Sequence, residues 1–464
     1  MLALNLCSIA AIVAGELVGS GAGVVNTAVS DSRQVAPGVL FIALRGERVD
    51  GHDYAQDALQ AGAVGVLCER YIPGVEPQII VDDCRQALAT LAKYQLQRYP
   101  VTIIGITGSV GKTSSKEIMA SVLSMKYNVL KSEGNMNTEI TLPITLFGLQ
   151  PHHDIAVLEM GMVAEGEITD LVSIAPPHIA LITNVLPVHL ERLGSIKAIA
   201  RAKAEIISGL PSDGVFLLNA DDPHVVEAYS LYRESGGQAR CQSFSMQQSA
   251  TIFTTQCESK GIQGTYFVAE LLDGTIQEYM LSLPGEHMVM NALPAILVAN
   301  LLGVSADDIA LALSNIHPAK QRLRVVSIAK SIELIDDTYN ANPVSTKSAL
   351  HIARDMAESR PLYVVLGDML ELGAESVASH QEIGRVTAEM NPVCLVVRGE
   401  LAVDIGREAE RCGLPKDRIV YVRDNIAAVQ FLCDTLPDNA VVLVKGSRGM
   451  QMEEIVAGLE AMLE

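Results

Sequence analysis

Short apolar runs alternate with stretches of helical period through the first hundred residues. Such alternation predicts a small α/β unit, in which strands carry the apolar runs and helices lie between them. The predicted strands are residues 39–44, 65–67 and 79–81, and the predicted helices are residues 1–18, a segment ending at Gly62, and residues 85–98.

Residues 99–318 open with a β-branched apolar run at 101–106. Glycines interrupt this run, and apolar residues at 118, 119, 122 and 123 then follow a helical spacing, which predicts a strand, a tight turn and a helix. Further predicted elements are strands at 154–158 and 179–184, a β-rich insertion at 240–282, and an apolar helix at 284–302.

The remaining residues, 319–464, show repeated strand–helix alternation, which predicts a doubly wound parallel sheet. The whole chain is therefore expected to be an α/β protein of three domains, covering 1–98, 99–318 and 319–464. The predicted strands of the last domain are residues 332–336, 362–366, 394–397, 419–422 and 441–444.

The composition narrows the classes of partner. The 464 residues include 34 basic and 54 acidic ones, and the net charge of −20 argues against nucleic acid as a partner. Eight cysteines are scattered without a C-x-x-C pair, which is typical of reduced thiols. The first basic residue is Arg33, and no apolar run reaches membrane-spanning length. We therefore expect a cytoplasmic protein without membrane insertion.

A glycine-rich turn, Gly-Ser-Val-Gly-Lys-Thr at 108–113, joins the first strand and helix of the middle domain. In such a turn backbone N–H groups point inward and the helix dipole favours an anion, so it cradles phosphates. Lys112 is placed to reach the outer phosphates, and Thr113 to hold magnesium. The strict phosphate-loop pattern has glycine where this chain has Ile106, with glycines instead at 105 and 108. The context still predicts a nucleoside triphosphate site.

Polar side chains follow several predicted strands, where open parallel sheets bind ligands. Glu159 ends one strand beside the phosphate loop, which is the position that a magnesium-binding carboxylate needs, although a strand-terminal glutamate can simply be solvated. In the last domain three clusters of polar residues share one sheet edge, at 336–342, 367–371 and 445–448. We expect a ligand site at these edges, with the polar loop containing Asn135, Asn137 and Thr138 facing substrate.

For some residues the sequence position alone does not predict a functional role. His189 alone would be a hydrogen-bonded structural histidine, and Lys203 alone a surface charge on a helix. Two polar loops of the first domain, at 30–33 and 45–52, are either turns or a site where Arg33 and Arg48 hold a diphosphate or uridine.

Together these motifs resemble the Mur ligases, the ATP-dependent enzymes that build the peptide stem of peptidoglycan. The run Asp-Asp-Thr-Tyr-Asn-Ala-Asn-Pro at 336–343 is the most specific and resembles the dipeptide-adding member. The chain departs from the usual family residues at Thr141, Gln321 and Thr346. The other matching motifs are Asp31-Ser-Arg33, Asp50-Gly-His52, Gly108–Thr113, Glu159-Met-Gly161, His189, Ala202-Lys203, Leu366-Gly-Asp-Met369 and Lys445–Arg448.

The resemblance implies a two-step reaction. The terminal carboxylate of UDP-N-acetylmuramoyl-tripeptide attacks the γ-phosphate of ATP to give an acyl phosphate, and the amine of D-alanyl-D-alanine then displaces phosphate. Because the attacking anion and the phosphoryl group repel each other, two Mg²⁺ ions and Lys112 are expected to neutralise charge. A monomer is expected, with domain closure around ATP.

The resemblance also assigns roles to residues. The catalytic set is Lys112, Glu159, His189 and Lys203, and the metal ligands are Thr113, Glu159, His189 and Lys203, the last as a carbamate formed with carbon dioxide. The cofactor-binding set is Gly108, Ser109, Val110, Gly111, Lys112, Thr113, Ser114, His287, Asn291, Arg322 and Asp336. The substrate-binding set is Ser30, Asp31, Ser32, Arg33, Arg48, Asp50, His52, Asn135, Asn137, Thr138, Tyr339, Asn340, Asn342, Lys445 and Arg448.

Three alternatives remain open from the sequence. One is a sibling ligase with another amino acceptor, such as the enzyme that adds the third residue or a folylpolyglutamate synthase. Another is a phosphate-loop ATPase that performs no ligation. The third is an inactive structural relative, which the presence of Lys112, Thr113, Glu159, His189 and Lys203 disfavours.

Overall fold

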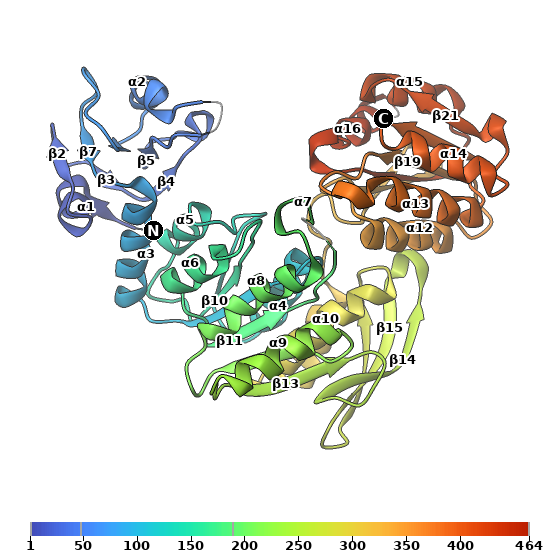
Figure 1. Ribbon diagram of the computed structural model, residues 1–464, viewed down its shortest axis with the longest axis horizontal. Helices are drawn as coiled ribbons and strands as arrows, with labels where there is room; N and C mark the ends of the chain where they lie inside the picture. The colour runs from blue at the N-terminus through green and yellow to red at the C-terminus, as the bar shows by residue number, and fades with distance from the viewer. Residues whose placement is uncertain (1, 47–48, 188–189, 463–464) are drawn as a thin grey trace.

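The computed structural model describes residues 2–46, 49–187 and 190–462. Each of three α/β units is built around its own sheet, and the N-terminal and C-terminal units lie at opposite ends of the central one (Figure 1). The predicted three-domain α/β architecture is confirmed. No helix in the described parts of the chain is both long and apolar enough to span a membrane.

The N-terminal sheet has the strand order β2-β7-β6-β5-β4, and its parallel strands carry the predicted apolar runs. Its strands are β2 (Glu16–Val18), β4 (Thr27–Val29), β5 (Val39–Ile42), β6 (Gly65–Cys68) and β7 (Gln78–Ile80), and its helices are α1 (Leu6–Ile12), α2 (Ala55–Gln60) and α3 (Cys84–Arg98). A separate pair, β1 (Leu4–Asn5) and β3 (Val24–Val25), is antiparallel.

The prediction of one helix over residues 1–18 is wrong. Asn5 begins α1 by accepting a hydrogen bond from the Ser8 backbone N–H at 2.8 Å. The helix stops at Ile12, because Ala14 adopts a positive φ of 53°. A Cβ added to Gly15 would lie 2.9 Å from the Ile80 carbonyl oxygen, so the chain packs closely here and continues into β2. Apolar content alone did not reveal these breaks.

The central sheet has nine strands in the order β16-β15-β14-β13-β12-β11-β8-β10-β9. It is parallel from β9 to β14, and β15 and β16 extend it as antiparallel strands. The β-rich insertion predicted at 240–282 corresponds to β13 to β16. The strands are β8 (Thr102–Thr107), β9 (Val129–Lys131), β10 (Ile155–Glu159), β11 (Ile179–Ile182), β12 (Val215–Asn219), β13 (Arg240–Ser245), β14 (Ile252–Ser259), β15 (Thr265–Leu271) and β16 (Ile276–Leu281).

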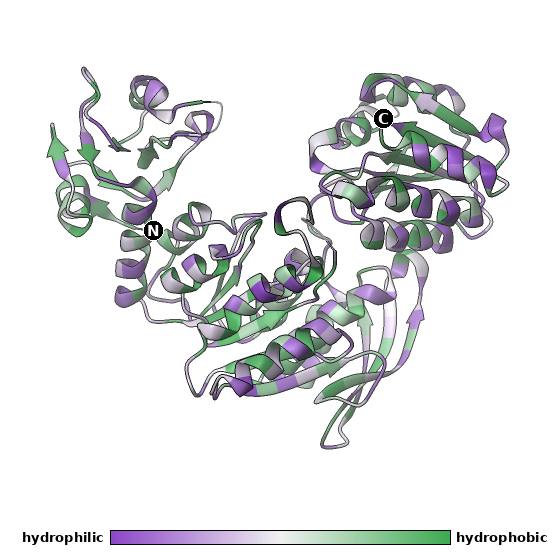
Figure 2. Cartoon of the chain, viewed as in Figure 1, coloured by the Kyte–Doolittle hydropathy of each residue, from purple (hydrophilic) through white to green (hydrophobic). Residues whose placement is uncertain are grey.

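Helices cover both faces of the central sheet, because successive strand residues point to opposite sides. On β8, Ile104 packs in the same buried cluster as Leu293, whereas Ile103 packs in another buried cluster together with Ile199. The inner parallel strands are accordingly mostly apolar, whereas β14 and β15 at the edge also carry polar residues (Figure 2). The helices are α4 (Lys112–Leu123), α5 (Thr141–Phe147), α6 (Glu167–Ile174), α7 (Leu190–Leu193), α8 (Ile196–Ser208), α9 (Pro223–Glu234), α10 (Glu286–Leu301) and α11 (Ala306–Ser314).

The C-terminal sheet has the order β17-β18-β22-β19-β20-β21. It is parallel as predicted except for β17 (Arg324–Ile328), an antiparallel edge strand whose half-exposed residues gave no clear apolar run. The other strands are β18 (Ile332–Asp337), β19 (Leu362–Gly367), β20 (Cys394–Arg398), β21 (Ile419–Val422) and β22 (Val441–Lys445). The helices are α12 (Pro343–Ala357), α13 (Ser376–Met390), α14 (Val403–Arg411), α15 (Asn425–Thr435) and α16 (Glu453–Met462).

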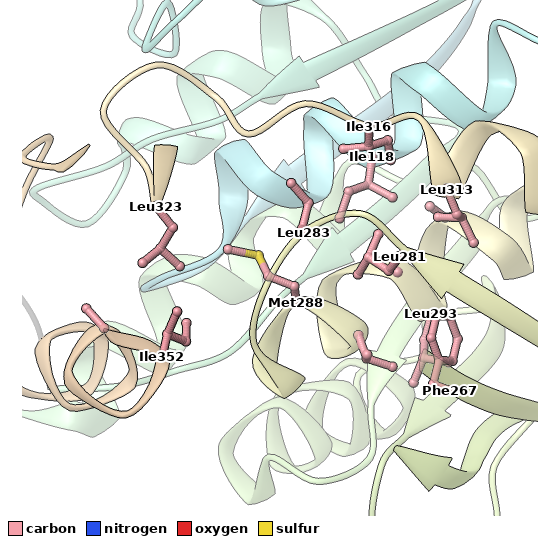
Figure 3. Packing of buried hydrophobic residues seen from close by; sticks show 14 of the residues in the cluster. Ile118, Phe267, Leu281, Leu283, Met288, Leu293, Leu313, Ile316, Leu323 and Ile352 are labelled. Atoms are coloured by element: carbon pink, nitrogen blue, oxygen red, sulfur yellow. The ribbon is translucent and has the colours of Figure 1, made fainter. Parts of the chain in front are cut away.

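An apolar junction joins the central and C-terminal units. Leu283 and Met288 of the central unit belong to the same buried cluster as Leu323 and Ile352 beyond it (Figure 3). A Cβ added to Gly285, which has a φ of +98°, would lie 2.6 Å from Ile352 Cδ1. This close packing holds the beginning of α10 against α12.

Candidate active site

A cavity of about 750 Å³, here called the interdomain cavity, lies where the carboxyl ends of the central and C-terminal strands meet. Residues far apart in sequence line it, which is the arrangement that open α/β sheets use for ligands. The predicted site residues in its lining are Ser109, Val110, Gly111, Lys112, Ser114, Asn135, Asn137, Thr138, Glu159, His287, Asn291, Arg322, Tyr339, Asn340, Asn342 and Lys445.

Two glycines allow the phosphate loop to approach its neighbours closely. Gly108 has a φ of +151°, and a Cβ there would lie 1.8 Å from Thr183 Oγ1. Gly111 has a φ of +84°, and a Cβ there would lie 2.5 Å from Asn291 Oδ1. Both positions therefore exclude larger residues, and Gly111 leads directly into the N-terminus of α4.

The residues after β11 fix the shape of the phosphate loop. The Val110 N–H donates to Asn184 Oδ1 at 3.0 Å, and the Val110 carbonyl accepts from Thr183 Oγ1 at 2.6 Å and Asn184 Nδ2 at 3.1 Å. Ser109 Oγ donates to the Leu186 carbonyl at 3.0 Å. The sequence analysis did not identify Thr183 or Asn184, whose only signal was their place at the end of a predicted strand.

Lys112 lies folded over the loop that precedes it. Its Nζ donates to the carbonyl oxygens of Gly108 at 2.7 Å and Ser109 at 3.3 Å. Burial lowers the pKa of Lys112, the charge of Glu159 opposes this shift, and the charge of Arg322 adds to it. The ammonium is thus held at the phosphate cradle by two backbone carbonyls. Because these acceptors carry no net charge, the positive charge of Lys112 stays available for an anion.

Glu159 is buried, with 2% of its surface exposed, at the end of β10. Its Oε2 accepts from Thr113 Oγ1 and its Oε1 accepts from Asn137 Nδ2, both at 2.9 Å. A carboxylate next to the hydroxyl that follows the phosphate-loop lysine is the donor set that holds nucleotide-bound Mg²⁺ in phosphate-loop proteins. The residues here therefore fit a magnesium ion.

Lys203 on α8 is 2% exposed. Within the described residues no hydrogen bond or ion pair reaches its Nζ. Burial lowers the pKa of Lys203 well below its ordinary value, and the nearby charge of Lys112 lowers it further. It is therefore a buried amine and not the surface charge that its sequence position alone suggested. His189, which was predicted together with Lys203 as a metal ligand, lies outside the described residues.

The C-terminal wall of the cavity carries a cation over an aromatic ring and a buried ion pair. The Arg322 guanidinium lies 4.1 Å from the centroid of the Tyr339 ring. Lys445 Nζ donates to Asp337 Oδ2 at 2.5 Å and to the Asn340 carbonyl at 3.0 Å. Asn342 caps α12 by accepting from the Ser345 N–H at 2.9 Å.

Asp337, which the sequence analysis left without a role, lines the cavity in place of Asp336. Because strand side chains alternate, Asp336 points to the other face of β18, where Oδ1 accepts from Thr338 Oγ1 at 2.6 Å and Arg324 lies 4.0 Å away. Burial raises the pKa of Asp336. Arg448 also lies outside the cavity lining and pairs with Glu453 at 2.9 Å. The cofactor role of Asp336 and the substrate role of Arg448 stay predictions.

The start of α10 closes the cavity beside the phosphate loop. Asn291 Oδ1 accepts from Ser115 Oγ at 3.2 Å, which links α10 to α4. Burial lowers the pKa of His287 to about 4, although the charge of Asp337 opposes the shift. His287 is therefore neutral at physiological pH.

The predicted uridine-site residues lie in the N-terminal unit, away from the interdomain cavity. Arg33 donates to Asp31 from Nε at 2.9 Å and from Nη2 at 2.7 Å. Asp50 accepts from His52 Nδ1 at 2.6 Å and from Arg70 at 3.1 Å. Arg48 lies outside the described residues. The pair of Arg33 and Asp31 orders the loop that also contains Ser30 and Ser32, and the contacts of Asp50 order the second loop. The role of both loops in binding substrate stays a prediction.

The fold and the cavity define an α/β nucleotide-binding protein of the phosphate-loop class, and comparison with known proteins identifies its family. The chain matches the Mur ligase family, catalytic domain over residues 28–95, the Mur ligase middle domain over 106–299, and the Mur ligase, glutamate ligase domain over 321–448. With full-length relatives above 30% identity, the chain belongs to the Mur ligase family. The family predicted from the sequence is confirmed.

The relatives carry a more specific name. The chain is 35% identical to UDP-N-acetylmuramoyl-tripeptide–D-alanyl-D-alanine ligase of Escherichia coli (strain K12), over 99% of both chains. It is 36% identical to the ligase of the same name from Bacillus subtilis (strain 168), over 94% of this chain and 93% of that one.

Two solved structures of proteins named MurF share the fold of this chain. A crystal structure of MurF from Acinetobacter baumannii superposes with a TM-score of 0.87 at 31% identity, covering 99% of both chains. MurF from Thermotoga maritima in complex with ADP superposes with a TM-score of 0.77 at 28% identity, covering 94% of this chain and 97% of that one.

We predict that Gly108→Ala lowers affinity for ATP by roughly tenfold or more, because the added Cβ would force the loop away from Thr183. Isothermal titration with a non-hydrolysable ATP analogue measures the change. Gly274→Ala is the matched control, since Gly274 also has a positive φ, +85°, but has nothing within 4 Å of the added Cβ. Equal affinity in the Gly108 variant and the wild type would contradict this account of the loop.

We predict that His287 makes stability depend on pH between 6.5 and about 4. The unfolded state takes up the proton near pH 6.5 and the folded state only near pH 4, so the free energy of unfolding falls as pH decreases through this window and this contribution levels off below it. Urea denaturation of the wild type and His287→Gln at several pH values measures the difference. The same change at the exposed His351 should leave the pH dependence as in the wild type.

Proposed function

We propose that this chain joins D-alanyl-D-alanine to UDP-N-acetylmuramoyl-tripeptide at the expense of ATP. The observation that supports this most strongly is the interdomain cavity, which places the phosphate loop and Glu159 opposite Tyr339 and Asn340. The first group suits phosphoryl transfer, and the second lies in the run that resembles the dipeptide-adding ligases. The full-length relatives carry the name of this activity.

The residues divide the chemistry between activation and transfer. The loop at 108–113 binds the phosphates of ATP. Lys112 stabilises the charge that develops as the tripeptide carboxylate attacks the γ-phosphate, the bond to the bridging oxygen breaks and ADP leaves. The cavity walls hold the resulting acyl phosphate away from water, and the dipeptide amine then attacks the acyl carbon and releases phosphate. Mg²⁺, when bound, neutralises phosphate charge, and Thr113 and Glu159 would hold it.

Lys203 suits a carbamate that completes a second magnesium site. Only a neutral amine adds carbon dioxide, and burial together with the charge of Lys112 favours the neutral form of Lys203. The addition forms an N–C bond and releases one proton, converting a buried amine without a partner in the described residues into an anion. That anion would reduce the mutual repulsion with Lys112 and attract a divalent cation.

The remaining lining residues bind the two organic substrates. Asn135 and Thr138 face the peptide of the nucleotide substrate, and Tyr339, Asn340 and Asn342 face the dipeptide. Lys445 Nζ donates to Asp337 and to the Asn340 carbonyl, and its third N–H is left to bind the dipeptide carboxylate. The loops at 30–33 and 50–52 hold the uridine diphosphate.

We also place the protein in the cytoplasm as a monomer. All eight cysteines are free thiols, which fits a reducing compartment.

The decisive experiment measures phosphate release from MgATP with and without each organic substrate. We expect release only when UDP-N-acetylmuramoyl-tripeptide and D-alanyl-D-alanine are both present, with the nucleotide-linked pentapeptide as product by mass spectrometry. Release that needs the nucleotide but is served by a single amino acid would make the protein a sibling ligase. Release that ignores both substrates would contradict ligation altogether.

Removal of the Lys203 amine should lower kcat by roughly 100-fold or more, because the proposed carbamate can no longer form. We expect Lys203→Ala to regain part of its activity when short carboxylic acids are added to replace the carbamate. Lys197→Ala, an exposed lysine on the same helix, is the control. Full activity of Lys203→Ala without added acid would remove Lys203 from the reaction.

A further inference from the structure

Lys116 is a second buried cation on α4, one turn beyond the phosphate loop. Its side chain is completely buried. Its Nζ donates to the carbonyl oxygens of Ser132 at 2.6 Å and Gly134 at 3.2 Å, and it lies 3.0 Å from Glu117 Oε1. Two of the three N–H donors of the ammonium are thus hydrogen-bonded to the backbone, and Glu117 forms an ion pair with it. This residue belongs to none of the roles assigned above.

The backbone that Lys116 holds supports Glu159. Ser132 Oγ accepts a hydrogen bond from the Glu159 N–H at 3.1 Å. Further along the same segment, Asn137 Nδ2 donates to Glu159 Oε1 at 2.9 Å, and the Asn137 carbonyl accepts from the Gly161 N–H at 2.9 Å. The segment 132–138 therefore holds the Glu159 backbone and one of its two carboxylate oxygens, while Thr113 binds the other.

This segment has little packing of its own, because cavities lie on both sides of it. Asn135, Asn137 and Thr138 line the interdomain cavity. Glu133 and Met136 line a different cavity of about 760 Å³, between the central and N-terminal units. A segment with a cavity on each side needs hydrogen bonds to keep one conformation. Lys116, which lies on helix α4, supplies two of them.

The charge of Lys116 is balanced on the side away from the active site. Glu117 Oε2 accepts from Lys131 Nζ at 2.5 Å while its Oε1 faces Lys116. Burial opposes ionisation of Glu117, but the hydrogen bond from Lys131 and the charge of Lys116 keep its pKa below the ordinary value. The two lysines thus share one carboxylate, and only Lys116 reaches the segment beneath Glu159.

We propose that Lys116 is a positioning residue, which fixes the segment 132–138 so that Asn137 orients Glu159 and the peptide-facing side chains. The inference rests on the proposed ligase reaction, in which Glu159 holds the metal that ATP requires. Lys116 contacts neither ATP nor the peptide, and it acts through the backbone of Ser132 and Gly134.

The test compares Lys116→Met with Lys131→Met, which removes the other lysine bound to Glu117 but leaves the carbonyl anchors intact. We expect Lys116→Met to lower kcat by roughly 10- to 100-fold, the effect of a small misplacement of catalytic groups, while KM for ATP stays within about twofold. Lys131→Met should retain kcat within about twofold. A purely structural role would reduce the amount of folded enzyme and leave kcat per folded molecule unchanged.

A double-mutant cycle with Asn137→Ala identifies the route of the effect. If Lys116 acts through Asn137, the double variant should be no slower than the slower single variant; losses that multiply would overturn the proposal. Wild-type kcat in Lys116→Met would overturn it as well. Should that variant not fold, Lys116→Gln takes its place with the same outcomes. A wild-type enzyme that makes no pentapeptide would instead contradict the proposed function.

Discussion

The close contact between the phosphate loop and the end of β11 is the constraint on which the site depends. Gly108 can pass Thr183 only because it lacks a Cβ, and the backbone of Val110 is then bound from both sides by Thr183 and Asn184. Once the loop is fixed, α4 begins at Lys112 and brings Thr113 to Glu159. The phosphate cradle is thus set by a neighbouring strand as much as by its own sequence.

Each half of the site comes from a different unit, so the apolar junction has a functional consequence. Gly285 and Met288 lie at the start of α10 and contact the C-terminal unit, while Asn291, one turn later, touches the phosphate loop. Any movement of the C-terminal unit about this junction changes the distance from Arg322 and Tyr339 to the phosphate loop. A short helix segment therefore connects domain position with nucleotide geometry.

The sequence predicted most of the fold and many of the residues that line the interdomain cavity, and the failures have identifiable physical causes. Buried strands such as β8 and β22 are nearly continuous apolar runs, so their positions could be predicted from the sequence. The opening helix was overestimated because the breaks at Ala14 and Gly15 depend on packing against β7. Asp337 was overlooked in favour of Asp336 because only the register of β18 decides which carboxylate faces the cavity.

Buried lysines show how an acidic protein of net charge −20 builds a place for anions. Lys112 and Lys116 are both held by backbone carbonyls, and Lys116 is further neutralised by Glu117. Lys203 has neither kind of partner among the described residues, and the charge of Lys112 disfavours its protonation. Burying an ammonium without acceptors costs several kcal/mol, and this cost favours the neutral amine. Backbone carbonyls therefore hold two of the buried lysines, and the third is the buried amine for which we propose a carbamate.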